Sequence, residues 1–509
     1  MRRRDFLGVL PLAVALPRPA LAQDPRIADF VQRQARALAA QPYKAPSKTL
    51  PPALATLDYD AYRDLRYRPD KALWRDLNLP FQLQMFHRAG QHADVVELFE
   101  VYGGVIRPIP YRADAFTAGP LASGALAPDL GFGGFRIHAQ INEPGRFDEF
   151  AVFQGASYFR AIPRGGVYGL SARGIEIGSG EAGEEFPAFR SFFIERPAAG
   201  ATSITVHALL DGPSLAGAYR FEITPGDPTA FAVTAVLYPR ATLARVGIAP
   251  LTSMFLFGPE QPRRYDDFRP EVHDSDGLLA GPGAADRTWR PLANPARPEI
   301  IRGDEGPAAG FGLLQRARAL EAYQDLEAHY HRRPGAWVAP ASDWGAGRVQ
   351  LVELHARDET EDNIVASWRP TSALEAGIEH RFAYDLIWSS SPQPPGPLAW
   401  ASAWREGAGG APGRRRYVVE FAGLDLRSLG EVSPEVTASA GAILHPTLQP
   451  NPTAGALRLS FEFDPGDALV SDLRARLAGA AAAPRSETWL RKWAADPAGA
   501  ANPGARQAH

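Results

Sequence analysis

The 509-residue chain contains no cysteine. This absence excludes disulfide bonds, thiol catalysis and cysteine-ligated metal sites, but it leaves the compartment open, because an exported protein can also lack disulfides. No segment beyond the N-terminal region has 18 consecutive apolar residues, so we expect no membrane-spanning helix in the mature protein. The formal net charge is only −3, which provides no basic footprint for binding nucleic acid.

Long helical patterns are scarce as well. One helix is predicted over Arg26–Gln41, where four apolar residues recur at helical spacing and Pro42 follows. From Phe81 onward, short β-branched and aromatic runs are broken by glycine and proline, which is typical of strands. The clearest of these runs are Phe81–Phe86, Phe135–Ala139, Phe192–Glu195, Ser203–His207, Tyr219–Ile223, Phe231–Tyr238 and Leu457–Phe463. We therefore predict an all-β protein and not a parallel α/β sheet.

The N-terminus has the three parts of an export signal. Arg2–Leu7 carries a twin-arginine pattern, Phe6–Leu16 is a short apolar run, and Ala20-Leu-Ala22 matches a cleavage site. We predict a twin-arginine signal peptide over residues 1–22, cleavage after Ala22 and a mature protein that works in the periplasm. The alternative is a basic N-terminus that arose by chance.

The composition also suggests where the domains divide. Ser389–Arg416 is rich in proline and glycine and has little that can be buried. We therefore predict an N-terminal domain over residues 23–390, a linker over 391–415, a smaller sandwich over 416–495 and a disordered tail over 496–509.

Two acidic clusters carry the chemistry. Asp266–Gly277 holds five carboxylates, one arginine and one histidine in twelve residues, and Asp358–Asn363 precedes an apolar run. So many carboxylates cannot all face an apolar core, so some must line water, a metal or a polar ligand. Two such clusters are what a carboxylate pair for acid and base catalysis on a sugar requires. A calcium loop at Asp274–Gly277 is disfavoured, because the following ligand positions are not oxygen donors.

Longer motifs resemble a known family, the osmoregulated periplasmic glucan biosynthesis proteins OpgG and OpgD, also called MdoG and MdoD. The resemblance spans the mature chain, and the twin-arginine signal is more similar to the OpgD branch. The motifs that carry it are Thr252-Ser-Met-Phe255, Phe257-Gly258, Asp267-Phe-Arg-Pro-Glu-Val-His-Asp-Ser-Asp-Gly-Leu278, Trp289-Arg-Pro-Leu292, Gly310-Phe-Gly-Leu-Leu-Gln-Arg316, Tyr323-Gln-Asp-Leu-Glu-Ala-His-Tyr330, Arg332-Arg-Pro334, Asp343-Trp-Gly345 and Asp362-Asn-Ile-Val365.

The resemblance implies both a fold and a function. The fold would be a large N-terminal β-sandwich of galactose-mutarotase-like (supersandwich) type with a cleft, followed by an immunoglobulin-like β-sandwich. The function would be hydrolysis or transglycosylation of β-1,2-glucan without a cofactor or a metal, with Asp362 as general acid and Asp274 as general base. A different reading is a non-catalytic glucan-binding scaffold that assists a membrane glucan synthase.

The residues around these carboxylates suggest how they would work. Asp362 has acidic neighbours and precedes an apolar run, and both features would favour its protonated form. Aromatic rings stack on the C–H faces of sugars, and charged side chains bind their hydroxyls. The expected substrate-binding residues are Tyr330, Arg332, Arg333, Glu359, Asn363, His273, Asp276 and Trp344. The structural alternatives are that Asp362 and Asp274 are turn residues, that the histidines are satisfied polar groups and that the tryptophans belong to the core.

Overall fold

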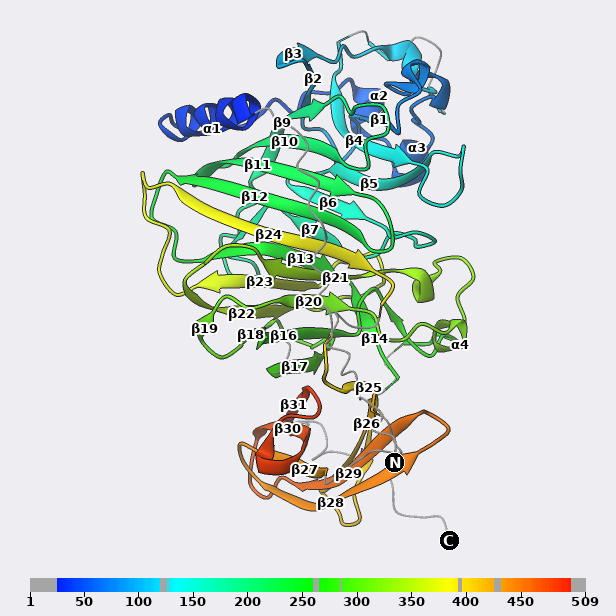
Figure 1. Ribbon diagram of the computed structural model, residues 1–509, viewed down its shortest axis with the longest axis vertical. Helices are drawn as coiled ribbons and strands as arrows, with labels where there is room; N and C mark the ends of the chain where they lie inside the picture. The colour runs from blue at the N-terminus through cyan, green and yellow to red at the C-terminus, as the bar shows by residue number, and fades with distance from the viewer. Residues whose placement is uncertain are drawn as a thin grey trace, which may run out of the picture.

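The protein is described by a computed structural model that covers residues 25–119, 126–127, 129–259, 265–283, 286–391, 396–424 and 432–495. Within these residues the prediction of an all-β fold is confirmed: two large sheets form the body of the molecule and a smaller sandwich lies below it (Figure 1). The predicted signal peptide and the predicted tail lie outside the described residues. None of the helices described here combines the length and the apolar character needed to cross a membrane.

The predicted N-terminal helix is confirmed as α1, Pro25–Ala39. Its apolar stripe, which includes Ile27 and Val31, is buried against side chains of three adjacent strands. These strands are β10 (Ile204–Asp211), β11 (Leu215–Thr224) and β12 (Thr229–Pro239). The helix therefore covers the outer face of one sheet (Figure 1), because that face also carries apolar residues.

The first sheet has eleven strands, and every pair in it is antiparallel. Alternate residues of each strand face the core, as Ile364, Ala366 and Trp368 do, so the residues between them form a second, more polar face. The strands are β1 (Phe81–His87), β4 (Phe132–Ala139), β5 (Asp148–Gln154), β6 (Tyr158–Ala161), β7 (Ser171–Arg173), β8 (Ile175–Ile177), β13 (Val246–Ser253), β18 (Glu299–Arg302), β19 (Gly306–Pro307), β22 (Ala346–Glu353) and β23 (Ile364–Pro370).

The second sheet has fourteen strands and packs on the first through one shared apolar core. That core is rich in phenylalanine, and Phe153 and Phe221, from opposite sheets, are 5.2 Å apart between ring centroids. This sheet contains β10 to β12 together with β2 (Glu97–Tyr102), β3 (Val105–Pro108), β9 (Ala188–Glu195), β16 (Gly277–Gly283), β17 (Asp286–Pro291), β20 (Phe311–Leu314), β21 (Gly335–Pro340), β24 (His380–Ser389), β27 (Ser433–Ala438), β30 (Val470–Ala478) and β31 (Thr488–Ala494).

The C-terminal sandwich is continuous with the body of the molecule. One of its sheets contains β25 (Trp400–Ala408), β26 (Arg415–Ala422), β28 (Ala442–Asn451) and β29 (Ala456–Asp464). The strands that face it, β27, β30 and β31, belong to the fourteen-stranded sheet, because β31 pairs in parallel with β17. The small core is also shared, since Leu279, Trp289 and Leu314 contribute to it.

Strand β25 differs from the sequence-based expectation, because it lies inside residues 391–415, which the composition assigned to a linker. Trp404 of this strand is 6% exposed and packs 5.6 Å from Trp489 between ring centroids. The burial of these aromatic rings stabilises a strand in a segment whose glycine and proline content suggested none.

Short elements at one edge of the body form the candidate site. Strands β14 (Phe255–Phe257) and β15 (Val272–His273) make a small two-stranded sheet. The short helices α4 (Leu320–Tyr323) and η4 (Tyr330–Arg332) lie in the segment between the two acidic clusters. Apolar and aromatic side chains from these elements pack into a satellite cluster that holds them against the sandwich.

Candidate functional site

Asp274 is fixed immediately after β15. Its backbone N–H donates to the Met254 carbonyl at 2.8 Å, and its side chain is buried. One carboxylate oxygen accepts a short hydrogen bond from the Arg333 guanidinium. Because an ion pair of this kind restricts both partners, the pairing sets the orientation of the Asp274 carboxylate.

Arg333 in turn is held by Tyr330. Its guanidinium lies over the Tyr330 ring at 4.1 Å, and its Nε and Nη2 atoms both donate to the Ala328 carbonyl at 3.2 Å. Burial alone would lower the pKa of Arg333, but the charge of Asp274 outweighs burial and raises it. The guanidinium therefore stays charged, and it links the two segments that carry Asp274 and Tyr330.

The Tyr330 hydroxyl contacts a cluster of charged side chains around Arg269. Tyr330 donates to Glu359 Oε2 at 2.9 Å, and Arg269 Nη1 donates to the same oxygen at 2.6 Å. Arg269 also pairs with Asp267 at 2.7 Å and with Asp325 at 2.9 Å. Burial raises the pKa of Tyr330, so its hydroxyl remains a neutral donor. We call Arg269, Asp267, Asp325 and Glu359 the Arg269 cluster.

Sequence reasoning did not single out Arg269 as a site residue. The available signal was its position, because it is the one cation within the acidic stretch Asp266–Gly277. An arginine whose sequence neighbours are mostly carboxylates is a good candidate for forming ion pairs with carboxylates in the folded protein.

Asp362 lies just before β23, beside the polar face of the eleven-stranded sheet. Its side chain is 38% exposed, and the nearest cation is Arg160 of β6, whose Nη2 lies 4.0 Å from Asp362 Oδ2. Partial desolvation by the surrounding residues raises the pKa of Asp362; Arg160 opposes the rise, and the charge of Asp274 adds to it. The pKa of Asp362 therefore depends on Asp274, which places the two carboxyl groups within electrostatic reach of each other.

The polar face of the eleven-stranded sheet carries buried hydrogen-bonding groups that have no protein partner in the described part of the chain. Among the described residues, several buried polar atoms on this face have no hydrogen-bond partner: Arg136 Nε, Ser171 Oγ, Arg173 Nη2 and Thr252 Oγ1. Buried polar groups are normally paired, so these atoms need water or a polar ligand. A polyhydroxyl ligand such as a glycan meets that need.

Two of the predicted substrate-binding residues point away from solvent. The His273 ring is fully buried, with Nδ1 at 2.9 Å from Gln315 Oε1 and Nε2 at 2.9 Å from Glu271 Oε2. The Asn363 amide is also buried and bonds the backbone of Phe255 and Leu354 at 2.8 to 3.0 Å. The Asn363 side chain thus holds two backbone segments together, whereas both ring nitrogens of His273 are used by neighbouring side chains.

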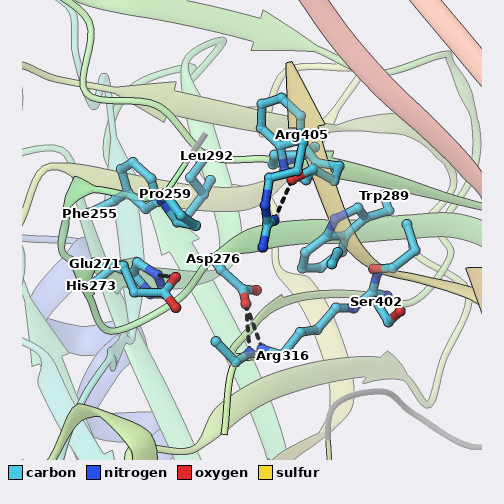
Figure 2. Close-up of a pocket in the computed structure, with 15 residues that line it drawn as sticks. Phe255, Pro259, Glu271, His273, Asp276, Trp289, Leu292, Arg316, Ser402 and Arg405 are labelled. Carbon is cyan, nitrogen blue, oxygen red and sulfur yellow. Dashed lines mark hydrogen bonds and ion pairs between the residues drawn. The ribbon is translucent and has the colours of Figure 1, made fainter. Parts of the chain in front are cut away.

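Three further predicted residues do not contact Asp274, Arg333 or the Arg269 cluster through the hydrogen bonds described here. Trp344 is buried in the core and donates to the Ala383 carbonyl at 3.1 Å. Arg332 is exposed and donates to the Gly165 carbonyl at 2.7 Å. Asp276 turns toward the C-terminal sandwich and accepts from the backbone N–H groups of Arg316 and Ala317 at 2.7 and 3.0 Å (Figure 2). Of the predicted set, Tyr330, Arg333 and Glu359 therefore lie with Asp274.

The environment of Asn363 leads to a stability prediction. Asn363→Ala should lower the free energy of unfolding by about 2–4 kcal/mol, because it leaves buried backbone groups of Phe255 and Leu354 without partners. Urea unfolding followed by tryptophan fluorescence measures this loss. Asn142→Ala, which removes an amide from an exposed loop, is the control and should change stability far less. A loss of glucan affinity at unchanged stability would contradict this scaffolding role.

The described residues contain no group of three or more histidine, aspartate or glutamate side chains arranged to hold a metal ion. The charged side chains around Asp274 instead pair with one another, through Arg333 and the Arg269 cluster. The chemistry available to this arrangement is proton transfer by carboxyl groups and hydrogen bonding by the tyrosine and the arginines.

Comparisons with known proteins identify the family. Residues 28–493 match the family described as "Periplasmic glucan biosynthesis protein, MdoG". A relative from Rhodopseudomonas palustris (strain BisA53), named Glucans biosynthesis protein G, is 47% identical over 97% of this chain and 100% of its own length. Another from Vibrio cholerae (strain O395), with the same name, is 46% identical over 91% of this chain and 86% of its own length.

A solved structure, described as a galactose mutarotase related enzyme from Lactobacillus acidophilus, matches 51% of this chain and 95% of its own, at 10% identity and a TM-score of 0.22. The two relatives are both named G, which corrects the sequence-based expectation of closer similarity to the OpgD branch. That expectation depended on the N-terminal arginines, and an export signal is read by the export machinery and not by the glucan site.

Proposed function

Because this chain belongs to the family of periplasmic glucan biosynthesis proteins, MdoG, we propose that it acts on the β-1,2-glucan backbone as a glycoside hydrolase or a related transglycosylase. Asp362 is the general acid, which donates its proton to the glycosidic oxygen as the C–O bond breaks. Asp274 is the general base, which accepts the proton of the attacking water, or of a sugar hydroxyl in transfer.

The observation that supports this proposal best is the contrast between the two carboxyl groups. Burial and the charge of Asp274 raise the pKa of Asp362, against the opposing charges of Arg160 at 4.0 Å and of Arg333, and a raised pKa favours the protonated form that a general acid needs. Asp274 is paired with Arg333, which is the environment of a carboxylate that accepts one. Enzymes that use two carboxyl groups for opposite roles separate them by environment in this way.

The other site residues have supporting roles in the proposal. Arg333 and Tyr330 orient Asp274, and Glu359 orients Tyr330. The unpaired polar atoms on the polar face of the eleven-stranded sheet bind the hydroxyl groups of the glucan chain. The reaction requires no cofactor, because proton transfer and water suffice. We also propose export through the twin-arginine route with cleavage after Ala22, so that the enzyme meets its glucan in the periplasm.

The test is a product analysis with the mature protein from Gln23 onward. Linear β-1,2-glucan and, as a control, linear β-1,3-glucan are incubated with the protein and separated by chromatography. Shorter products from the β-1,2-glucan alone establish hydrolysis, and cyclic or longer products establish transfer. Unchanged glucan that nevertheless binds the protein would overturn the catalytic proposal in favour of a scaffold that assists a membrane glucan synthase.

The raised pKa of Asp362 also predicts how activity depends on pH. The general acid must be protonated, so kcat/KM should fall as pH rises through the pKa of Asp362. Arg160 opposes the rise of that pKa. Arg160→Gln should therefore raise it further and move the alkaline limb of the profile to higher pH.

The control for this shift is Arg220→Gln, which breaks a pair with Glu222 on β11, far from Asp362 in the sequence and on the other sheet. Its profile should superimpose on that of the wild type. If Arg160→Gln leaves the alkaline limb in place, Asp362 is not the group whose protonation sets it.

A further inference from the structure

We infer that the C-terminal sandwich is a positioning part of the catalytic site, because Arg316 and Glu487 hold the loop that carries Asp274. The inference depends on the proposed function for its kinetic consequences, but its structural consequence can be measured without any turnover. Arg316 follows β20 in the body of the molecule, and Glu487 precedes β31 in the C-terminal sandwich.

The contact between the two residues is buried and specific. The Arg316 guanidinium donates to both oxygens of Glu487, at 2.6 and 2.9 Å, and each side chain is 3% exposed. Arg316 Nη1 also donates to the Ala401 carbonyl at 2.8 Å, and the Ala401 N–H donates back to Glu487 at 2.9 Å. The guanidinium lies over the Trp289 ring at 3.5 Å. We call this contact the interdomain latch.

The backbone beside the latch holds both segments of the candidate site. The N–H groups of Arg316 and Ala317 donate to Asp276, two residues from Asp274, and the Asp276 N–H donates to the Leu314 carbonyl at 2.9 Å. Gln315 Nε2 donates to the carbonyl of His273 at 3.1 Å and to that of Tyr330 at 3.2 Å. A displacement of residues 314–317 would therefore move the segments of Asp274 and Tyr330 together.

A cavity borders the latch, and Arg316, Trp289 and Ala401 are among the residues that line it. It has a volume of about 120 Å³ and lies between the loop, with Glu271 and Asp276, and strand β25, with Trp404 and Arg405 (Figure 2). Asp276 Oδ1 is buried and has no hydrogen-bond partner among the described residues. Loosely filled space resists displacement less than close packing does, so the hydrogen bonds of the latch have to fix the loop.

A strand pairing joins the two domains beside the latch. Strand β31, which begins directly after Glu487, pairs with β17 at Thr288↔Thr488 and Trp289↔Trp489. The Trp289 ring that stacks on Arg316 therefore belongs to the strand that joins the domains. The C-terminal sandwich cannot tilt away without pulling on both the ion pair and this pairing.

The test compares two substitutions in the mature full-length protein. Glu487→Gln keeps the size of the side chain but removes its charge, so we expect kcat on β-1,2-glucan to fall by about 10- to 100-fold, with KM nearly unchanged. Hydrogen exchange of the amides in residues 272–278 and 314–317 should become faster. Asp211→Asn is the matched control, because it breaks another buried ion pair, with Arg240 at 2.8 Å, remote from this loop in the fold. It should leave kcat and the exchange of both segments unchanged.

Arg316→Lys provides a second measurement if Glu487→Gln does not fold. Lysine keeps one charged contact with Glu487 but cannot make the bidentate hydrogen bond. The fall in kcat and the faster hydrogen exchange should therefore have the same direction and a smaller size than in Glu487→Gln. Exchange at 272–278 that is unchanged in folded Glu487→Gln overturns the inference, and so does faster exchange with full kcat. If the wild type does not cleave the glucan, the proposed function fails, while the exchange measurement still decides whether the latch holds the loop.

Discussion

Replacing Asp362 by asparagine is expected to reduce kcat on β-1,2-glucan by about 1000-fold, because a positioned general acid contributes roughly 10²- to 10⁴-fold to such reactions. Asparagine has nearly the same shape but no acidic proton. Among the described residues, no hydrogen bond to this carboxyl group is found and the one ion-pair partner lies 4.0 Å away, so the substitution breaks little. Glucan affinity and the free energy of unfolding should therefore stay close to those of the wild type.

The matched control for this experiment is Asp358→Asn, four residues earlier in the same acidic cluster. The Asp358 side chain bonds only Thr360 of its own turn and is exposed. It should retain full kcat. If both variants lose turnover equally, or if Asp362→Asn loses affinity and keeps kcat, then Asp362 does not protonate the leaving group.

The sequence predicted the fold class well, because that prediction depends on repeated local patterns. Alternation of apolar and polar residues identified strands such as β29, and helical spacing identified α1. The junction between the domains was harder to predict from the sequence. Strand β25 is stabilised by Trp404 packing on Trp489, a contact across 85 residues of sequence that local composition cannot reveal.

The candidate site was predictable where the residues carry opposite charges in neighbouring motifs. The structure connects Asp274, Tyr330, Arg333 and Glu359, which the motifs offered as candidates, through direct side-chain contacts. His273 and Asn363 lie in the same motifs but are buried. Asn363 satisfies backbone groups of Phe255 and Leu354, and the His273 ring pairs with the side chains of Gln315 and Glu271. A motif therefore contains both the residues that face a ligand and those that hold them, and only the structure separates the two.

Arg269 belongs to the second group, and its replacement is the other large effect we expect. Arg269→Met leaves Asp267, Asp325 and Glu359 without their common cation. Removing one partner from buried ion pairs costs about 3–5 kcal/mol, and we expect about 3 kcal/mol here because Glu359 is 37% exposed. The kcat should also fall by about 100-fold, because Glu359, which accepts the hydrogen bond of Tyr330, loses the cation that holds it in place.

The pH dependence of this stability loss distinguishes the electrostatic explanation from a loss of packing. Burial alone would raise the pKa of Asp325, but the backbone N–H of Ala328 and the Arg269 guanidinium outweigh it and lower the pKa. A carboxyl group whose pKa is lower in the folded than in the unfolded protein adds to the free energy of unfolding at pH values above its unfolded pKa of about 4. That contribution is lost as the pH falls through the folded pKa. The difference between wild type and Arg269→Met should therefore be largest at neutral pH and shrink toward acid pH.

Two variants show whether Arg269 positions the site or only stabilises the fold. Arg269→Lys keeps the charge but cannot reach three carboxylates at once, so it should recover part of the stability and less of the turnover. Arg196→Met breaks the forked pair, at 2.6 and 2.9 Å, between Glu100 of β2 and Arg196, which directly follows β9. It should cost stability with full kcat. The kcat of both variants is measured well below their unfolding temperatures. If Arg269→Met and Arg196→Met lose kcat equally, the Arg269 cluster only holds the fold together. If only Arg269→Met loses kcat, Tyr330 needs Glu359 and Arg269 to act.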